Sequence, residues 1–202
     1  MVVLVAWQKT AGLVDEGGRL SRLGELFKAT WPDATLAWQL LWVNTVFRFA
    51  TAAWYVHTVG AGHSCTVPEM VARPMSDRCG TPRKSAHAAV YELVGLVQLT
   101  PIGTELWQGR VLPTRPRAVQ RAGLDRPERA ALAYAAQQLF LLEARTYLSL
   151  AEHLLWTWVV FGRSLDAVFP RLASSGIGWL RLDETAMWLE IPLEALRHEV
   201  LF

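Results

Sequence analysis

Apolar residues recur at helical spacing along several stretches of the chain. Between residues 34 and 62 they follow the three- and four-residue steps of a helix, at Leu36, Leu40, Val43 and Phe47. The stretch carries a single charge, Arg48, and is long enough to cross a bilayer. Polar side chains near its centre, such as Asn44 and Thr45, would be costly to bury in lipid. The pattern therefore predicts a buried core helix, and we expect no membrane partner.

Two segments of the chain resemble each other. Residues 11–14 read Ala-Gly-Leu-Val and precede Leu20-Ser21-Arg22-Leu23-Gly24, while residues 94–97 read Val-Gly-Leu-Val and precede Leu99-Thr100-Pro101-Ile102-Gly103. In each, an apolar helix (residues 2–7 or 86–93) runs into a glycine suited to its C-terminus, and two short strands joined by a turn follow. Ser21 and Thr100 are then placed to cap the next helix. Helix, strand, turn, strand and helix is the closing half of a winged helix.

These patterns predict a mainly helical α+β protein with winged-helix-like units followed by a helical C-terminal part. Residues 1–62 would form a winged-helix-like unit plus a Trp-rich helix. Residues 63–127 would form a second unit, with residues 63–84 as its linker or entry and residues 110–127 as a polar connection. Residues 128–202 would form the C-terminal part, with a helix over 129–155, a hairpin over 179–191 and a last helix from Pro192.

The charge is concentrated in one region although the net charge is only +2. Residues 71–130 carry ten basic and five acidic side chains, and 17 of the chain's 20 basic residues are Arg. Arginine suits phosphate recognition, although a GC-rich genome would produce the same bias. We expect double-stranded DNA as the partner, and the candidate DNA-binding residues are Lys9, Arg19, Arg22, Arg83, Lys84, Arg110, Arg115, Arg117 and Arg121.

Candidate catalytic chemistry is sparse. The sequence has no phosphate-binding glycine loop and no acyl-transfer motif. His63, Cys65, Cys79 and His87 lack the paired spacing of small zinc sites, and only two cysteines fit a reducing cytoplasm. The best-clustered carboxylates are Asp183, Glu184 and Glu190, which are candidates for holding Mg²⁺ or Mn²⁺, although acidic residues on a strand usually form a solvated face.

Among ten tryptophans, most recur at core spacing. Stacking on a nucleic-acid base requires an exposed ring beside a basic groove. Only Trp107, three residues before Arg110, has such a sequence neighbourhood.

The chain resembles a family associated with DNA phosphorothioation systems, including SspB-like components of single-strand modification systems. The resemblance lies in Met1-Val2, Trp7, Gly12-Leu13-Val14, Leu20-x-x-Leu23-Gly24, Trp38-x-x-Leu41-Trp42, Trp54-Tyr55, Thr100-Pro101-Ile102-Gly103-x-x-Leu106, Arg121, Ala133-Tyr134-Ala135 and Leu196…Val200-Leu201. The chain departs from that family by beginning at the expected recognition helix, without the helices that usually precede it.

The resemblance implies a DNA-binding, DNA-nicking component that works with other subunits of a sulfur-modification system in phage defence. It assigns no catalytic residue. Two alternatives stay open, a winged-helix scaffold for protein–protein contacts and a transcription regulator that binds an operator as a homodimer.

Overall fold

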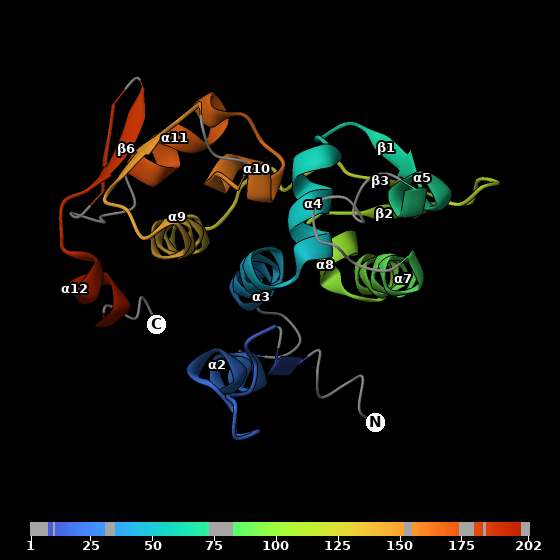
Figure 1. Ribbon diagram of the computed structural model, residues 1–202, viewed down its shortest axis with the longest axis horizontal. Helices are drawn as coiled ribbons and strands as arrows, with labels where there is room; N and C mark the ends of the chain where they lie inside the picture. Colours follow the sequence, from blue (N-terminus) through green and yellow to red (C-terminus); the bar gives the residue numbers. More distant parts are fainter. Residues whose placement is uncertain are drawn as a thin grey trace.

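The computed structural model describes residues 8–9, 11–30, 35–72, 83–151, 155–173, 180–183 and 185–198. Over these residues the protein is mainly helical α+β, with ten helices and two three-stranded antiparallel sheets. Figure 1 shows one sheet on each side of the helix α3 (Thr35–Arg48). No described helix combines the length and apolar character needed to cross a bilayer.

The two sheets belong to units with the same order of elements. In each unit a helix leads into the first strand, two or three further helices follow, and a two-stranded hairpin closes the sheet. The first unit contains α4 (Ala50–Thr58), β1 (Ser64–Thr66), α5 (Val67–Ala72), α7 (Arg83–Leu99), α8 (Pro101–Thr104), β2 (Arg110–Leu112) and β3 (Ala118–Gln120). The second contains α9 (Arg129–Glu143), β4 (Tyr147–Ser149), α10 (Thr157–Phe161), α11 (Leu165–Ala173), β5 (Leu180–Leu182) and β6 (Ala186–Leu189).

The strands are also arranged in the same way in both units. The last strand lies in the middle of each sheet, so that the orders are β1-β3-β2 and β4-β6-β5. Val119 pairs with both Cys65 and Val111, and Met187 pairs with both Leu148 and Leu182. Val119 and Met187 are buried, so that each sheet faces the core at its central strand.

The helix α3 is the centre of the core. The expected buried helix over residues 34–62 is present, but it is divided at Phe49 into α3 and α4. The polar residues of α3 hold surrounding segments: Asn44 donates to the main-chain oxygen of Ala11 and accepts from the Tyr134 hydroxyl, and Gln39 accepts from the main-chain N–H of Glu128. Burial raises the pKa of Tyr134. These bonds explain why polar side chains occur within an apolar helix.

The segment of residues 11–30 lies beneath α3 in the view of Figure 1, and the C-terminal helix lies below the second sheet and contacts α9. A single antiparallel bridge joins Val14 to Leu20 before α2 (Arg22–Thr30), as the expected first hairpin requires. The predicted helix after Pro192 is present as α12 (Leu193–His198). The predicted helix over residues 2–7 lies outside the described residues.

The expected strands near residues 94–97 are wrong. Helix α7 continues through Gly95 to Leu99, and the short helix α8 follows at once. Gly95 is tolerated because its helix is held by buried neighbours, among them Leu93, Val94 and Leu96. The second copy of the sequence echo therefore contains no hairpin at this place.

What the two echoing segments share is a helix start. Ser21 donates to the Gly12 oxygen and accepts from the Gly24 N–H, while Thr100 accepts from the Ile102 N–H. Three residues after each cap, a Cβ on Gly24 or Gly103 would collide with a main-chain oxygen, that of Leu13 or Val97. The repeated Ser/Thr-x-x-Gly pattern therefore records a capped helix whose first turn packs tightly on the preceding segment.

Three further expectations need correction. The predicted helix over 129–155 ends at Glu143, because Ala144 takes a left-handed conformation with φ of 51° and β4 follows. The predicted linker over 63–84 contains β1 and α5. The predicted polar connection over 110–127 contains the β2–β3 hairpin. The predicted hairpin over 179–191 is confirmed by β5 and β6.

Arg121 joins the two units. Its guanidinium is buried, with 1% of the residue exposed, and donates to Gln108 Oε1 at 3.0 Å from both Nε and Nη2. It also donates to the main-chain oxygens of Val56 and Val59 in the first unit and of Val159 and Val160 in the second. These acceptors are uncharged, and burial lowers the pKa of Arg121 to about 10.

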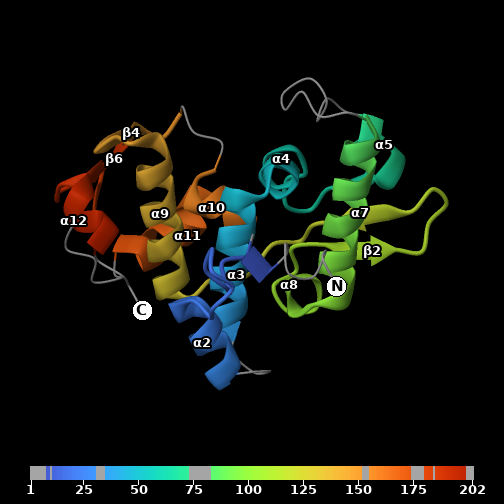
Figure 2. The ribbon, with the colours of Figure 1, turned by 60° about the horizontal axis from the view of Figure 1, so that its bottom comes forward.

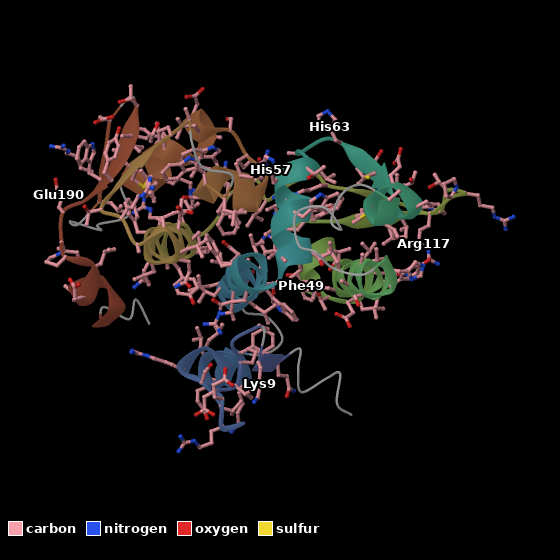
Figure 3. The ribbon with its side chains drawn as sticks, viewed as in Figure 1. Lys9, Phe49, His57, His63, Arg117 and Glu190 are labelled. Atoms are coloured by element: carbon pink, nitrogen blue, oxygen red, sulfur yellow. The ribbon has the colours of Figure 1, made fainter. Side chains whose placement is uncertain are left out.

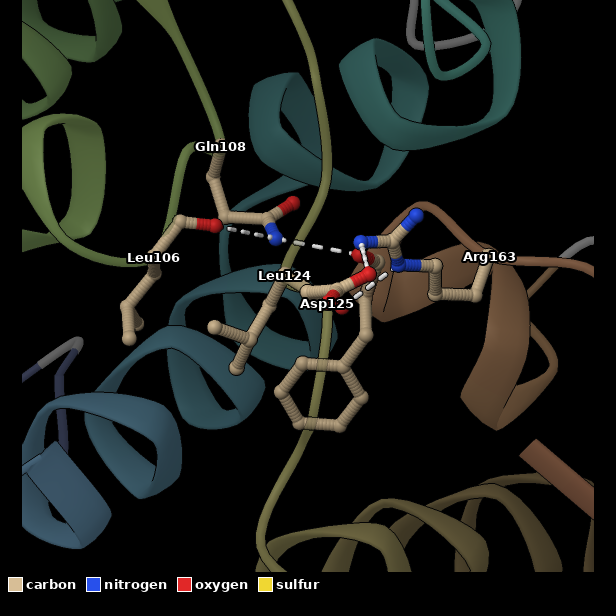
Figure 4. A network of polar contacts seen from close by, with 6 residues as sticks. Leu106, Gln108, Leu124, Asp125 and Arg163 are labelled. Carbon is tan, nitrogen blue, oxygen red and sulfur yellow. Dashed lines mark hydrogen bonds and ion pairs between the residues drawn. The ribbon is translucent and has the colours of Figure 1, made fainter. Parts of the chain in front are cut away.

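Neighbouring side chains add further hydrogen bonds between the two units. Figure 4 shows Gln108 donating to the main-chain oxygens of Leu106 and Phe161, at 3.0 and 3.2 Å. Arg163 donates to the Leu124 oxygen and forms an ion pair with Asp125. The connection between the units is therefore a polar network that extends from the buried Arg121 to the exposed Asp125.

We predict that Arg121→Ala lowers the free energy of unfolding by about 3 kcal/mol or more. The substitution leaves Gln108 and several buried carbonyl oxygens without their donor. Urea unfolding measures the change. Arg117→Ala, which removes an exposed arginine from the same hairpin, should stay within about 0.5 kcal/mol of the parent. Equal losses in the two variants would contradict the role of Arg121 as the joint.

Candidate nucleic-acid interface

An open groove of about 700 Å³ runs along the β2 edge of the first sheet. One wall comes from the end of α7 and from α8, and the other from β2 and the start of the loop after it. Because β2 is an edge strand, its outer side is not covered by another strand of the sheet. The groove lies between the longest helix of the first unit and its hairpin.

Arginines line this groove, and its lining contains no carboxylate, although the exposed Glu105 follows the lining residue Thr104. Arg110 and Arg117 are among its lining residues, and Arg115 is exposed in the same loop. No acidic residue occurs from Leu106 to Leu124. Within the described residues, the side chains of these three arginines have no hydrogen-bond or ion-pair partner, so that they present positive charge to the solvent.

Figure 2 shows the β2–β3 loop projecting outward beyond α7, and Figure 3 shows Arg117 on this outer side of the molecule. The loop spans residues 113–117 and contains Pro113 and Pro116, which restrict its backbone. The arginines are therefore carried on a short, constrained projection.

Trp107 lies at the end of the groove near α8. The residue is 47% exposed, and its backbone has φ of 53° although it is not glycine. A positive φ at a bulky residue costs on the order of 1–3 kcal/mol and persists only where the surroundings impose it. Its carbonyl oxygen accepts from the N–H groups of Ala122 and Gly123, which fixes the residue in this conformation.

The exposed side of α7 carries small, polar and aromatic side chains, the carboxylate of Glu92 and, at its end, the apolar Leu99. His87 and Tyr91 pack ring against ring, with centroids 4.6 Å apart, and both are exposed. Arg83 and Lys84 occupy the first two positions of the helix, and their side chains lie outside the described residues. The helix is therefore basic by sequence only at its N-terminal end.

The candidate residues near the N-terminus have a different environment. Lys9 donates to the Glu16 carbonyl and forms an ion pair with its carboxylate, and Arg19 pairs with Asp15 at 3.3 Å. Arg22 is exposed at the start of α2. Because two carboxylates accompany Lys9 and Arg19, this hairpin has little net positive charge compared with the β2–β3 hairpin.

The prediction that Arg121 binds DNA is wrong. Its guanidinium is turned into the core and bonded to protein oxygens, so that it has no access to a phosphate. The sequence signal for this residue was its membership of an arginine-rich segment. No pattern within this segment separates Arg121 from its exposed neighbours, because β3 has only three residues.

The candidate metal-binding carboxylates are not brought together in the part of the chain that the structure describes, where no group of three or more His, Cys, Asp or Glu occurs. Asp183 is occupied by its own hairpin: Oδ1 accepts from the N–H groups of Thr185 and Ala186, and Oδ2 accepts from the Trp188 indole. Glu184 lies outside the described residues. Glu190 lies at the opposite end of the molecule from Arg117 (Figure 3).

The described cysteine and histidine candidates lie in different parts of the first unit. Cys65 is buried at the centre of β1, His87 packs on Tyr91, and Cys79 lies outside the described residues. Among the described residues, Cys65, His63 and His87 do not belong to a group of three or more metal-ligating side chains.

Comparison of the chain with protein-family models, with curated proteins and with solved structures finds no match. The groove and its arginines therefore carry the functional argument.

We predict that Asp183 stabilises the fold in a pH-dependent way. Its hydrogen bonds, first that from Thr185, lower its pKa from 3.8 to about 2. A carboxyl whose pKa is lowered on folding contributes stability above its unfolded pKa and loses that contribution as the pH falls through the folded pKa. The stability difference between the parent and Asp183→Ala should therefore be full at pH 5 and should shrink between pH 4 and pH 2. Urea unfolding at each pH measures it.

Glu190→Ala is the control for this experiment, because Glu190 is an exposed carboxylate near the same hairpin. Its effect should be small at each pH. A pH-independent loss in Asp183→Ala would show that the charge on Asp183 is not involved.

Proposed function

We propose that the protein binds double-stranded DNA through its first unit, with α7 facing the duplex and the β2–β3 hairpin contacting the sugar–phosphate backbone. The observation that carries this proposal is the set of three exposed arginines, Arg110, Arg115 and Arg117, along a groove with no carboxylate in its lining. Arginine binds phosphate oxygens through a planar fork of donors, and such contacts supply most sequence-independent affinity for DNA.

The topology of the first unit supports a winged-helix assignment. A helix, a strand, further helices and a hairpin, with the last strand central in the sheet, is the arrangement of that fold. In winged helices the helix before the hairpin commonly enters a DNA groove, and the hairpin contacts the backbone beside it. Here α7 would enter the major groove, which is wide enough to admit an α-helix, and the β2–β3 hairpin would contact the backbone.

Charge distinguishes the first unit from the second. The β5–β6 turn contains Asp183 and Glu184, whereas the corresponding β2–β3 loop contains Arg115 and Arg117. A phosphate backbone would be attracted to the first loop and repelled by the second. We therefore assign DNA binding to the first unit alone.

A role in DNA phosphorothioation and a nicking activity with Mg²⁺ or Mn²⁺ stay predictions of the family resemblance. A scaffold for protein contacts would show no salt-sensitive affinity for DNA. A transcription regulator would prefer one operator sequence, whereas backbone contacts by the three arginines favour similar affinity for different sequences.

We predict that Arg115→Ala with Arg117→Ala weakens binding to blunt duplex DNA of any sequence. Each phosphate contact adds about 0.9 to the slope of log affinity against log salt, so the double variant should flatten the slope by about two. Fluorescence anisotropy over a series of salt concentrations measures both quantities.

The matched control is Arg145→Ala with Arg181→Ala, which removes two exposed arginines from the second unit. This variant should keep the parent's slope. If both double variants change the slope equally, the attraction is a property of total charge and not of the β2–β3 hairpin.

A further inference from the structure

We propose that the groove beside Trp107 binds an unpaired nucleobase, so that the protein prefers a duplex with a single-stranded extension over a fully paired one. This inference rests on the proposed DNA binding and names the kind of DNA that the site favours. The indole of Trp107 would stack on the base, while Arg110 and Arg117 would contact the phosphates on either side of it.

The backbone of Trp107 is held in place on both sides of an exposed aromatic ring. Its neighbours Leu106 and Gln108 are both buried, and its carbonyl oxygen is held by two N–H donors from the segment after β3. The side chain between these fixed points has no hydrogen-bond or ring partner among the described residues. A fixed backbone lowers the conformational freedom that the residue loses when a base stacks on its ring.

The other exposed aromatic rings named above are engaged within the protein. Tyr91 packs on His87, and Tyr147 packs on Trp188 with ring centroids 4.3 Å apart. Arg181 lies over the Trp188 ring at 5.4 Å. Trp107 differs from them because its face is open to a groove.

The groove chemistry fits a nucleotide better than an apolar ligand. Its lining combines the indole and the apolar side chains of Val97 and Val111 with two arginines, the Gln98 amide and the Thr104 hydroxyl. Single-stranded nucleic acid is bound in this way elsewhere, by aromatic rings for the bases and by positive charge for the backbone. Because β2 is an edge strand, a peptide could instead add to the sheet here, but the two arginines favour an anionic chain.

The test compares a blunt duplex with the same duplex carrying a five-nucleotide thymine extension, both fluorescently labelled, by anisotropy at one salt concentration. Stacking of one base typically contributes about a tenfold gain in affinity. We expect the full-length chain to bind the extended duplex about tenfold more tightly. An RNA extension of equal length tests whether the base alone is sufficient, since stacking requires no deoxyribose.

Trp107→Gly is the main variant, because glycine adopts positive φ without strain and removes the ring. It should bind blunt duplex as the parent does and lose the preference for the extension. Trp107→Phe should keep part of the preference. Thermal unfolding of both variants checks the fold, and if the glycine variant does not fold, Trp107→Phe and Arg110→Ala decide the question through reduced preference.

The outcomes separate the two proposals. Binding of both duplexes with equal affinity by the parent would overturn the base-stacking site and leave the duplex proposal standing. A preference for the extended duplex that survives in Trp107→Gly would also overturn the base-stacking site. Failure to bind either duplex would refute the proposed function and with it this inference.

Discussion

The burial of one guanidinium determines how the two units are held together. Arg121 closes the strand β3 in the first unit, and its hydrogen bonds reach both the end of α4 and α10 in the second unit. Burying a cation costs free energy that uncharged oxygens recover only when several of them converge on it. Several segments supply these acceptors. The end of α4 and helix α10 supply main-chain oxygens, and the segment after α8 supplies the Gln108 side chain.

Whether an arginine of this hairpin is exposed or buried depends on its position relative to the sheet. Arg115 and Arg117 occupy the projecting loop and stay solvated, whereas Arg121 follows the central strand and points inward. The three residues are alike in sequence, and only their position relative to the sheet separates the solvated arginines from the structural one. Removing all of them together would therefore combine any effect on the proposed DNA binding with a loss of stability.

The sequence predicted the helical core, the first and last hairpins and the arginine-rich region, because those features depend on local periodicity and charge. It did not predict β1, β2, β3 or β4, each of which has three residues, too few for alternation to be recognised beside prolines and glycines. The role of Arg121 depends on partners 13 to 65 residues away, which a pattern within one segment does not reveal. Trp107 was identified from its basic neighbourhood, but its groove required the sheet.

The shortness of the strands has a consequence for solubility. Unpaired edges of long, flat strands recruit other chains and lead to aggregation. Here the edge strands β1, β2, β4 and β5 each have three residues, and β2 and β5 carry the arginines Arg110 and Arg181. Although the chain is 52% hydrophobic, the part that the structure describes thus offers little edge on which fibrils could grow, and the charge that we assign to DNA recognition at β2 also protects that edge from self-association.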